Sequence, residues 1–171
     1  MDFEEVVKKR QSVRKFEKKE LPEDKIRKIL ELANLSPSAG NLQARKVFLI
    51  KDKETKERIS LGRDFISEAG VILVVCADQN ESAEYGERGR ELYSIQDATI
   101  FTSYLQLAAT SLGLASCWVG AFDEEEIKRI LNIPEGLKPI AILPIGYPAE
   151  KPARTPRKKL ENIILDKNRF I

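Results

Sequence analysis

The chain has 171 residues, of which 42% are hydrophobic and 33% charged, an ordinary balance for a globular protein with a sizeable core. Its 29 basic and 27 acidic residues leave a net charge of only +2, so the overall charge does not favour a nucleic-acid partner. No change of composition marks a linker, and we expect a single domain over residues 1–171.

The cysteine and histidine counts exclude most of the common catalytic devices. Cys76 and Cys117 are far apart in apolar surroundings, which argues against a disulfide framework, a redox pair or a cysteine-based metal site. The chain has no histidine, so it lacks the commonest general base, the Ser-His-Asp and Cys-His systems and the usual zinc or iron ligands. We expect no metal, and we expect an enzyme of this composition to use the chemistry of a bound organic cofactor.

The hydropathy of the chain indicates where it works. The N-terminus, MDFEEVVKKR, is charged and has no apolar core of the signal-peptide type. No apolar run reaches the roughly 18–20 residues that a spanning helix needs. We therefore expect a cytoplasmic protein with no membrane partner.

Hydrophobic periodicity in the first half predicts helices and strands around a turn-rich loop. A strand covered on both faces is indicated at Ala69–Ala77, because this run is continuously apolar and rich in β-branched residues. The other expected elements are a helix from Phe3 into Arg10, a helix from Pro22 to Leu35, a loop over Ser36–Asn41, a strand over Lys46–Lys51 and a polar helix over Lys53–Leu61.

The second half predicts one long helix, a shorter helix and two strands. Ser94–Leu112 has a broad stripe of small and apolar residues and ends before Gly113, so we expect it to be a central helix. The other expected elements are a polar loop or exposed helical excursion over Gln79–Glu91, a short strand over Ala115–Val119, a helix capped by Asp123 with Glu126, and a strand over Ile140–Ile145. The order predicts an α+β layer fold with helices packed on a mixed sheet.

The first chemical motif is Arg10-Gln-Ser12-Val-Arg14. In an extended segment, Arg10, Ser12 and Arg14 would point to one side, roughly 6–7 Å apart. Two guanidinium groups beside a hydroxyl suit a terminal phosphate, which carries two negative charges or nearly so. The alternative is a solvated basic turn after a helix.

The second motif is Ser36-Pro-Ser-Ala-Gly-Asn-Leu-Gln43. Its small residues would let the backbone approach a flat ligand, and Asn41 and Gln43 would supply paired donors and acceptors. The alternative is an ordinary helix-to-strand loop.

Two further motifs lie toward the C-terminus. In Ala115–Phe122, Gly120 would allow an exposed backbone N–H to face a ligand, and the alternative role for Trp118 is that of an ordinary core residue. The basic stretch Arg154–Lys159 would either add positive charge to the phosphate site or form a solvated linker. The tail over residues 149–171 ends in apolar residues that need a surface to cover, such as that of a partner subunit.

Taken in order, RxSxR, PSxxNxQ, a long helix leading into LGLASCWVGAF, IGYP and a basic tail resemble the FMN-dependent nitroreductase family. The resemblance spans nearly the whole chain. It implies an α+β fold whose central mixed, mostly antiparallel sheet is flanked by helices. It also implies a homodimer that exchanges a C-terminal arm, from about residue 149, and binds FMN at the subunit interface.

The same resemblance implies a role for each motif. Arg10, Ser12 and Arg14 would hold the phosphate, ribityl chain and pyrimidine edge of FMN, and Arg157 and Lys158 would share the phosphate. The loop residues brought from the other subunit would be Ser38, Ala39, Asn41 and Gln43. Val119 and Gly120 would present a backbone N–H to flavin N5, and no side chain is named as catalytic.

The implied reaction has two half-reactions at one face of the flavin. NADH or NADPH would give hydride to N5, and a small organic acceptor (a nitroaromatic, a quinone or a flavin) would then be reduced in the same place. Two alternatives remain open: a flavin-fragmenting or dehalogenating enzyme on the same scaffold, and a non-catalytic FMN-binding protein. Ala44 and Arg45 replace the usual proline and aromatic residue, and the stretch from Tyr85 to Tyr93 is charged, so the acceptor is not predicted.

Overall fold

The computed structural model describes residues 1–165, so the predicted apolar residues Phe170 and Ile171 of the tail lie outside the described range. Its core is a four-stranded sheet in the order β1 (Arg45–Ile50), β2 (Val71–Asp78), β4 (Leu137–Gly146), β3 (Ala115–Ser116). All three strand pairs are antiparallel. An isolated parallel bridge adds residue 12 beside β3, and the predicted α+β fold with a mostly antiparallel sheet is confirmed.

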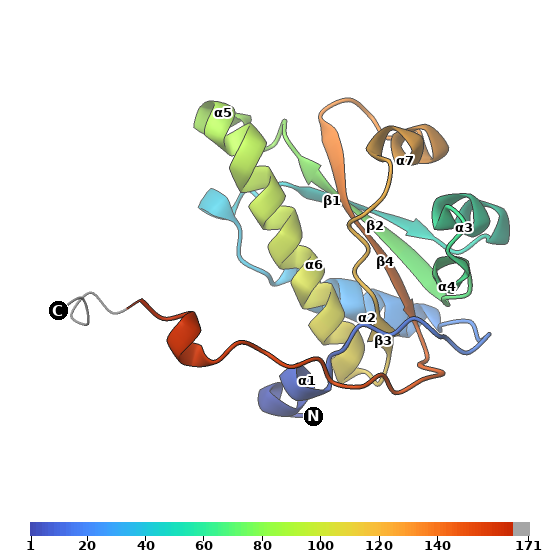
Figure 1. Ribbon diagram of the computed structural model, residues 1–171. Coiled ribbons are helices and arrows are strands. Elements are labelled where there is room, and N and C mark those ends of the chain that lie inside the picture. Colours follow the sequence, from blue (N-terminus) through green and yellow to red (C-terminus); the bar gives the residue numbers. More distant parts are fainter. Residues whose placement is uncertain (166–171) are drawn as a thin grey trace.

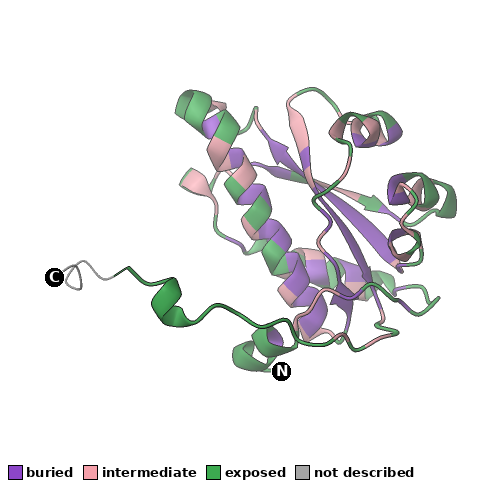
Figure 2. Cartoon of the chain, in the orientation of Figure 1, coloured by how far each residue is buried: buried purple, intermediate pink, exposed green. Residues whose placement is uncertain are grey.

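Helices cover both faces of this sheet (Figure 1). The face that carries Leu73 and Val75 packs against the long helix α6 (Ser94–Ser111) and α2 (Glu23–Asn34). The face that carries Ile72 and Val74 packs against α3 (Lys53–Ser60), α4 (Asp64–Ser67) and α7 (Glu124–Leu131). Since alternate side chains of a strand point to opposite faces, every residue of β2 is buried (Figure 2).

The remaining helical segments are short. Asp2 and Glu5 form a capping box at the start of α1 (Phe3–Lys9). The 3-10 turn η1 (Ala39–Asn41) lies inside the predicted turn-rich loop. The polar stretch after β2 is an excursion built from η2 (Ala83–Tyr85), α5 (Gly86–Arg88) and the π-helix η3 (Gly89–Tyr93), which runs directly into α6.

Two predicted strands were wrong in extent, and one short helix was not predicted. The strand predicted over Ala115–Val119 has only two residues in the structure. Cys117 faces Pro144 and donates its amide to the Pro144 carbonyl. Because proline has no N–H, Pro144 cannot donate a hydrogen bond back, and regular pairing ends there. Strand β4 begins at Leu137, three residues before the predicted Ile140. Helix α4 was not predicted, since four residues carry no readable period.

After β4 the tail first runs beside the N-terminal segment and then projects away from the body of the molecule (Figure 1). It contains the 3-10 turn η4 (Leu160–Asn162), and its large apolar side chains are 61–84% exposed at Leu160, Ile163, Ile164 and Leu165. Within residues 1–165, no helix combines the length and apolar character that a membrane crossing requires.

Candidate functional site

The N-terminal basic motif is extended and fixed against the end of the sheet. Ser12 forms a parallel bridge with Ser116, and the Val13 amide donates to the Ser116 carbonyl at 3.1 Å. Val13 is buried, whereas Ser12 is half-buried and Arg14 is exposed. This alternation is the one predicted for an extended segment, and it leaves the two arginines and the serine on the accessible side.

The tail crosses directly over this motif. The Ala149 amide donates to the Lys15 carbonyl at 2.9 Å, and a carboxylate oxygen of Glu150 accepts the Arg14 amide at 2.6 Å. The two segments enclose a cleft of about 460 Å³. The residues that line it are Val7, Arg10, Gln11, Ser12, Arg14, Pro152, Ala153, Arg154, Thr155 and Arg157.

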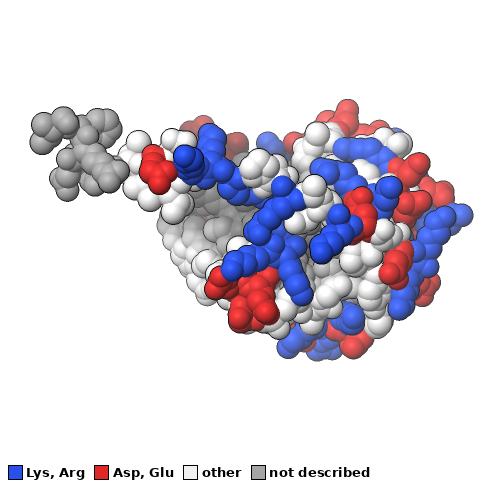
Figure 3. All heavy atoms as spheres, turned by 60° about the horizontal axis from the view of Figure 1, so that its bottom comes forward, with Lys and Arg blue, Asp and Glu red and all other residues white. Residues whose placement is uncertain are grey.

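The charge of this arginine cleft is one-sided. Four arginines, one serine and one threonine line it, and within the described part of the chain no acidic residue does. Figure 3 views the molecule from this side and shows Lys and Arg side chains concentrated along the tail and beside it. Such a set of donors is suited to an anion with several oxygens, such as a phosphate.

Four of the five predicted phosphate ligands therefore meet in one place: Arg10, Ser12, Arg14 and Arg157 line the cleft. Lys158 follows on the tail but does not line it. Arg154 and Thr155 do line it, although neither was among the predicted ligands. The basic stretch pointed to this region, but which of its side chains turn inward depends on the path of the tail.

The buried thiol of Cys117 lies behind the cleft, close to Ser12 and Arg14. Burial raises the pKa of Cys117, and the positive charge of Arg14 opposes that effect only in part. Because the thiol stays protonated near neutral pH, Cys117 is not an activated nucleophile.

The third predicted motif continues from Cys117. The Val119 amide donates to the Ile142 carbonyl at 3.0 Å, so this N–H already has its partner within the sheet. Gly120 is exposed, and a side chain at this position would meet only the indole of Trp118. Gly120 is therefore the residue of this pair whose amide can face a ligand.

The loop between α2 and β1 is held from beneath by a buried carboxylate. One oxygen of Asp97, on α6, accepts the Ala39 amide at 2.9 Å, and the other accepts the Ala44 amide at 3.2 Å. The Ser38 hydroxyl accepts the Gln43 amide at 3.0 Å and closes the loop above. Asp97 was not predicted as a site residue; an acidic residue within a long, mostly apolar and small-residue helix was the available signal.

The loop backbone is left-handed at three positions, with φ of 54° at Gly40, 59° at Asn41 and 55° at Gln43. Asparagine tolerates this region better than most residues, and glycine has no penalty there. The Gln43 side-chain amide donates to the Asn41 carbonyl at 3.2 Å, so part of the predicted donor set stabilises the loop itself.

Arg45 turns into the protein, away from the loop surface. Its guanidinium lies 4.9 Å from the centre of the Phe101 ring and donates to the Asn34 carbonyl at 3.2 Å. Burial lowers the pKa of Arg45, and the negative charge of Asp97 opposes that shift. Arg45 stands where the resemblance leads us to expect an aromatic residue, and its side chain supports the loop from below.

The loop and the arginine cleft are attached to α6 at different points. Asp97 holds the loop, and Gln106 donates to the Ser116 hydroxyl at 3.4 Å beside the cleft. At a rise of about 1.5 Å per residue, these two anchors are roughly 14 Å apart along the helix. The two predicted groups of ligands are therefore attached at separate points along α6.

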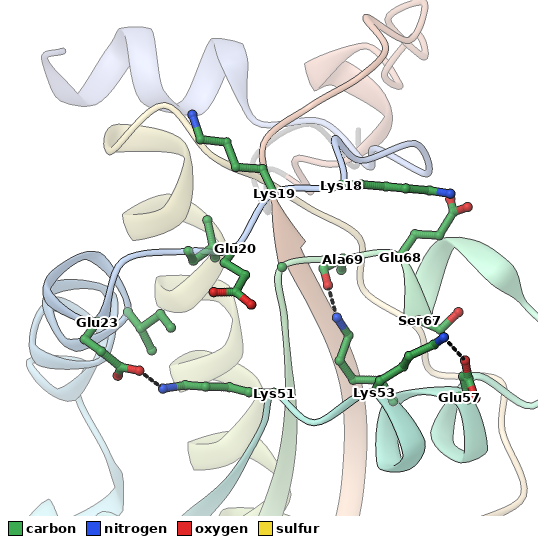
Figure 4. Close-up of a pocket in the computed structure, with 14 residues that line it drawn as sticks. Lys18, Lys19, Glu20, Glu23, Lys51, Lys53, Glu57, Ser67, Glu68 and Ala69 are labelled. Carbon is green, nitrogen blue, oxygen red and sulfur yellow. Dashed lines mark hydrogen bonds and ion pairs between the residues drawn. The ribbon is translucent and has the colours of Figure 1, made fainter.

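A second cleft, of about 620 Å³, contains none of the predicted ligands. It lies among the start of α2, the end of β1, α3 and the start of β2, and three of the five lysines that line it already have partners (Figure 4). Lys51 pairs with Glu23, and Lys53 lies 3.7 Å from Glu57. Lys56 donates to the Ala69 carbonyl. We interpret this cleft as a network of balanced surface charges.

The sequence profile of the nitroreductase family matches residues 7–61 and 60–147 of the chain. The chain belongs to the nitroreductase family. The matched residues include the N-terminal arginines, Gly120 and the loop that Asp97 holds. The tail arginines lie beyond the match.

Individual proteins with known names also resemble this chain over most of its length. An FMN reductase [NAD(P)H] of Bacillus subtilis is 31% identical over 89% of this chain and 68% of its own. An NADH dehydrogenase of Thermus thermophilus is 29% identical over 96% of both chains. A nitroreductase family protein from Clostridium difficile, whose crystal structure is known, has 31% sequence identity to this chain. Its structure superposes on this one with a TM-score of 0.88, covering 98% of this chain and 99% of that one.

Proposed function

We propose that this nitroreductase-family chain is an FMN-dependent oxidoreductase that transfers hydride from NADH or NADPH to a small organic acceptor. The acceptor classes are those expected from the sequence: nitroaromatics, quinones or flavins. The observation that carries the proposal is the arginine cleft, a carboxylate-free anion site formed by the N-terminal motif and the tail. The names of the Bacillus and Thermus relatives support the choice of flavin and nicotinamide.

The residues of the cleft fit the phosphate of FMN. A phosphate monoester carries between one and a half and two negative charges near neutral pH, and guanidinium groups bind its oxygens in pairs. Arg10, Ser12, Arg14 and Arg157 would hold that phosphate, with Arg154 beside them. Lys158 would add positive potential from outside the cleft, and the exposed Gly120 amide would face the ring. When bound, FMN supplies the hydride chemistry that the side chains lack.

We propose further that the complete site needs a homodimer. The resemblance to the family assigns the loop over residues 38–43 to the flavin of the partner subunit, and the anchor of this loop on α6 lies roughly 14 Å from the anchor beside the cleft of its own chain. Ser38, Ala39, Asn41 and Gln43 would then line the ring from that side. The exposed apolar residues of the tail would be covered in the same assembly.

An anaerobic absorbance titration of the purified protein, reconstituted with FMN, tests this function. We expect a yellow protein that bleaches on addition of NADH or NADPH and recovers its colour with a nitroaromatic, quinone or flavin acceptor. A protein that fails to retain FMN would refute the proposal. Retained FMN that neither nicotinamide bleaches would support the non-catalytic alternative, and bleaching without turnover of these acceptors would favour the dehalogenating or flavin-fragmenting alternative.

A further inference from the structure

The excursion between β2 and α6 rests on the loop that Asp97 holds. The Tyr85 hydroxyl lies so close to Gly40 that a Cβ atom at this glycine would collide with it. Gly89 likewise has no room for a side chain, because the Ser82 carbonyl lies against it. The packing fixes the excursion over residues 82–93 beside the loop that we propose to line the flavin.

Three side chains of the excursion form a connected cluster. The rings of Tyr85 and Tyr93 meet edge to face, with centroids 5.5 Å apart. The Arg88 guanidinium lies 5.5 Å from the centre of the Tyr93 ring, and its Nε donates to the Tyr93 hydroxyl at 3.1 Å. Arg88 is thereby held near Tyr85 and, through it, near the loop.

The terminal nitrogens of Arg88 remain available. The side chain is exposed, and among residues 1–165 it forms no ion pair although Glu84, Glu87 and Glu91 are near in sequence. A guanidinium whose Nε is already fixed still presents two nitrogens to a carboxylate or phosphate. An aromatic rim beside it suits a flat substrate that carries such a group.

We propose that Arg88, held by Tyr93, binds an anionic group on the substrate that stacks against the flavin. This inference rests on the proposed function and on the loop's place beside the ring. The group is either a phosphate of the nicotinamide donor that distinguishes NADPH from NADH, or a carboxylate on the acceptor. In both cases the chemistry is the same: a planar cation at the rim of the site.

The test compares Arg88→Gln with Arg90→Gln, which removes the same charge two residues away. Arg90 reaches toward Asn80 at 3.5 Å and lines a different surface depression, so it is a matched control. The KM values of NADPH and NADH form one pair of measurements. Those of para-nitrobenzoate and uncharged para-nitrobenzamide form the other, at fixed ionic strength.

We expect Arg88→Gln to raise KM for NADPH relative to NADH, or for nitrobenzoate relative to nitrobenzamide, by about fivefold or more. The expected change is only of this order because the Arg88 side chain is exposed, and a charge-assisted hydrogen bond contributes less in solvent than in a buried site. Arg90→Gln should change both members of each pair equally, and Arg88→Lys should restore part of the selectivity. Which pair responds identifies the source of the anion.

Equal KM changes within both pairs for Arg88→Gln would overturn this inference while leaving the proposed function intact. Absence of turnover in the wild-type protein with every donor and acceptor would instead refute the proposed function. The two failures are therefore distinguishable in one set of assays.

Discussion

Replacing Asp97 tests whether one buried carboxylate holds the loop of the proposed site. Asp97 is 1% exposed and accepts two backbone amides, those of Ala39 and Ala44, with one oxygen each. In Asp97→Asn the side chain keeps one acceptor oxygen, and its amide group faces the other backbone N–H. The negative charge opposite the buried Arg45 is lost as well.

The expected loss of stability follows from these contacts. A buried N–H without an acceptor costs about 1–3 kcal/mol, and the uncompensated guanidinium adds to that cost. We expect Asp97→Asn to lower the free energy of unfolding by about 2–3 kcal/mol. For a chain of this length that corresponds to a decrease in Tm of roughly 4–12 °C. Asp97→Ala, which removes both acceptors, should cost more.

Urea unfolding followed by circular dichroism, at one protomer concentration for all variants, measures this difference. Gln96→Ala is the matched control, because Gln96 is the exposed neighbour on the same helix and should change stability by no more than about 0.5 kcal/mol. If Asp97→Asn were as stable as this control, the carboxylate would not be what holds the loop.

Two further predictions concern the cleft and the buried strand. In Arg14→Ala combined with Arg157→Ala, the preference for FMN over riboflavin, measured as a ratio of Kd values, should fall at least about tenfold, since riboflavin lacks the phosphate. The exposed Arg129→Ala should leave that ratio as it is, and an unchanged ratio in the double variant would contradict the assignment. Burial raises the pKa of the Cys76 thiol to about 12 from an ordinary value of about 9, so above pH 9 the unfolded chain loses this proton while the folded chain keeps it. Stability should therefore fall with rising pH by about 1.4 kcal/mol per pH unit from this group. Alkaline unfolding curves of Cys76→Ala should lack that component, and a slope equal to wild type would refute it.

The local sequence pattern was enough to predict the structure wherever the environment of a segment depends on that segment alone. Strand β2 could be predicted because a continuous apolar run reports burial on both faces. The accessible positions of Arg10, Ser12 and Arg14 followed from strand alternation alone. The capping pair of Asp123 and the Glu126 amide was also visible in sequence.

Features that depend on a distant partner could not be read in this way. The short β3 results from Pro144 on the facing strand, not from any residue of its own segment. The tail brings Arg154 and Arg157 to the cleft and leaves Lys158 outside, and one contact that holds the tail there joins Glu150 to the distant Arg14 amide. The inward turn of Arg45 depends on Phe101 and Asp97, which lie on a helix some fifty residues later.

The arginine cleft joins two segments that are far apart in sequence, since its walls come from residues 7–14 and 152–157. The strands and the long helix α6 all lie between these two segments. A chain cleaved by a protease just before residue 150 would therefore keep the sheet and the long helix but only one wall of the cleft.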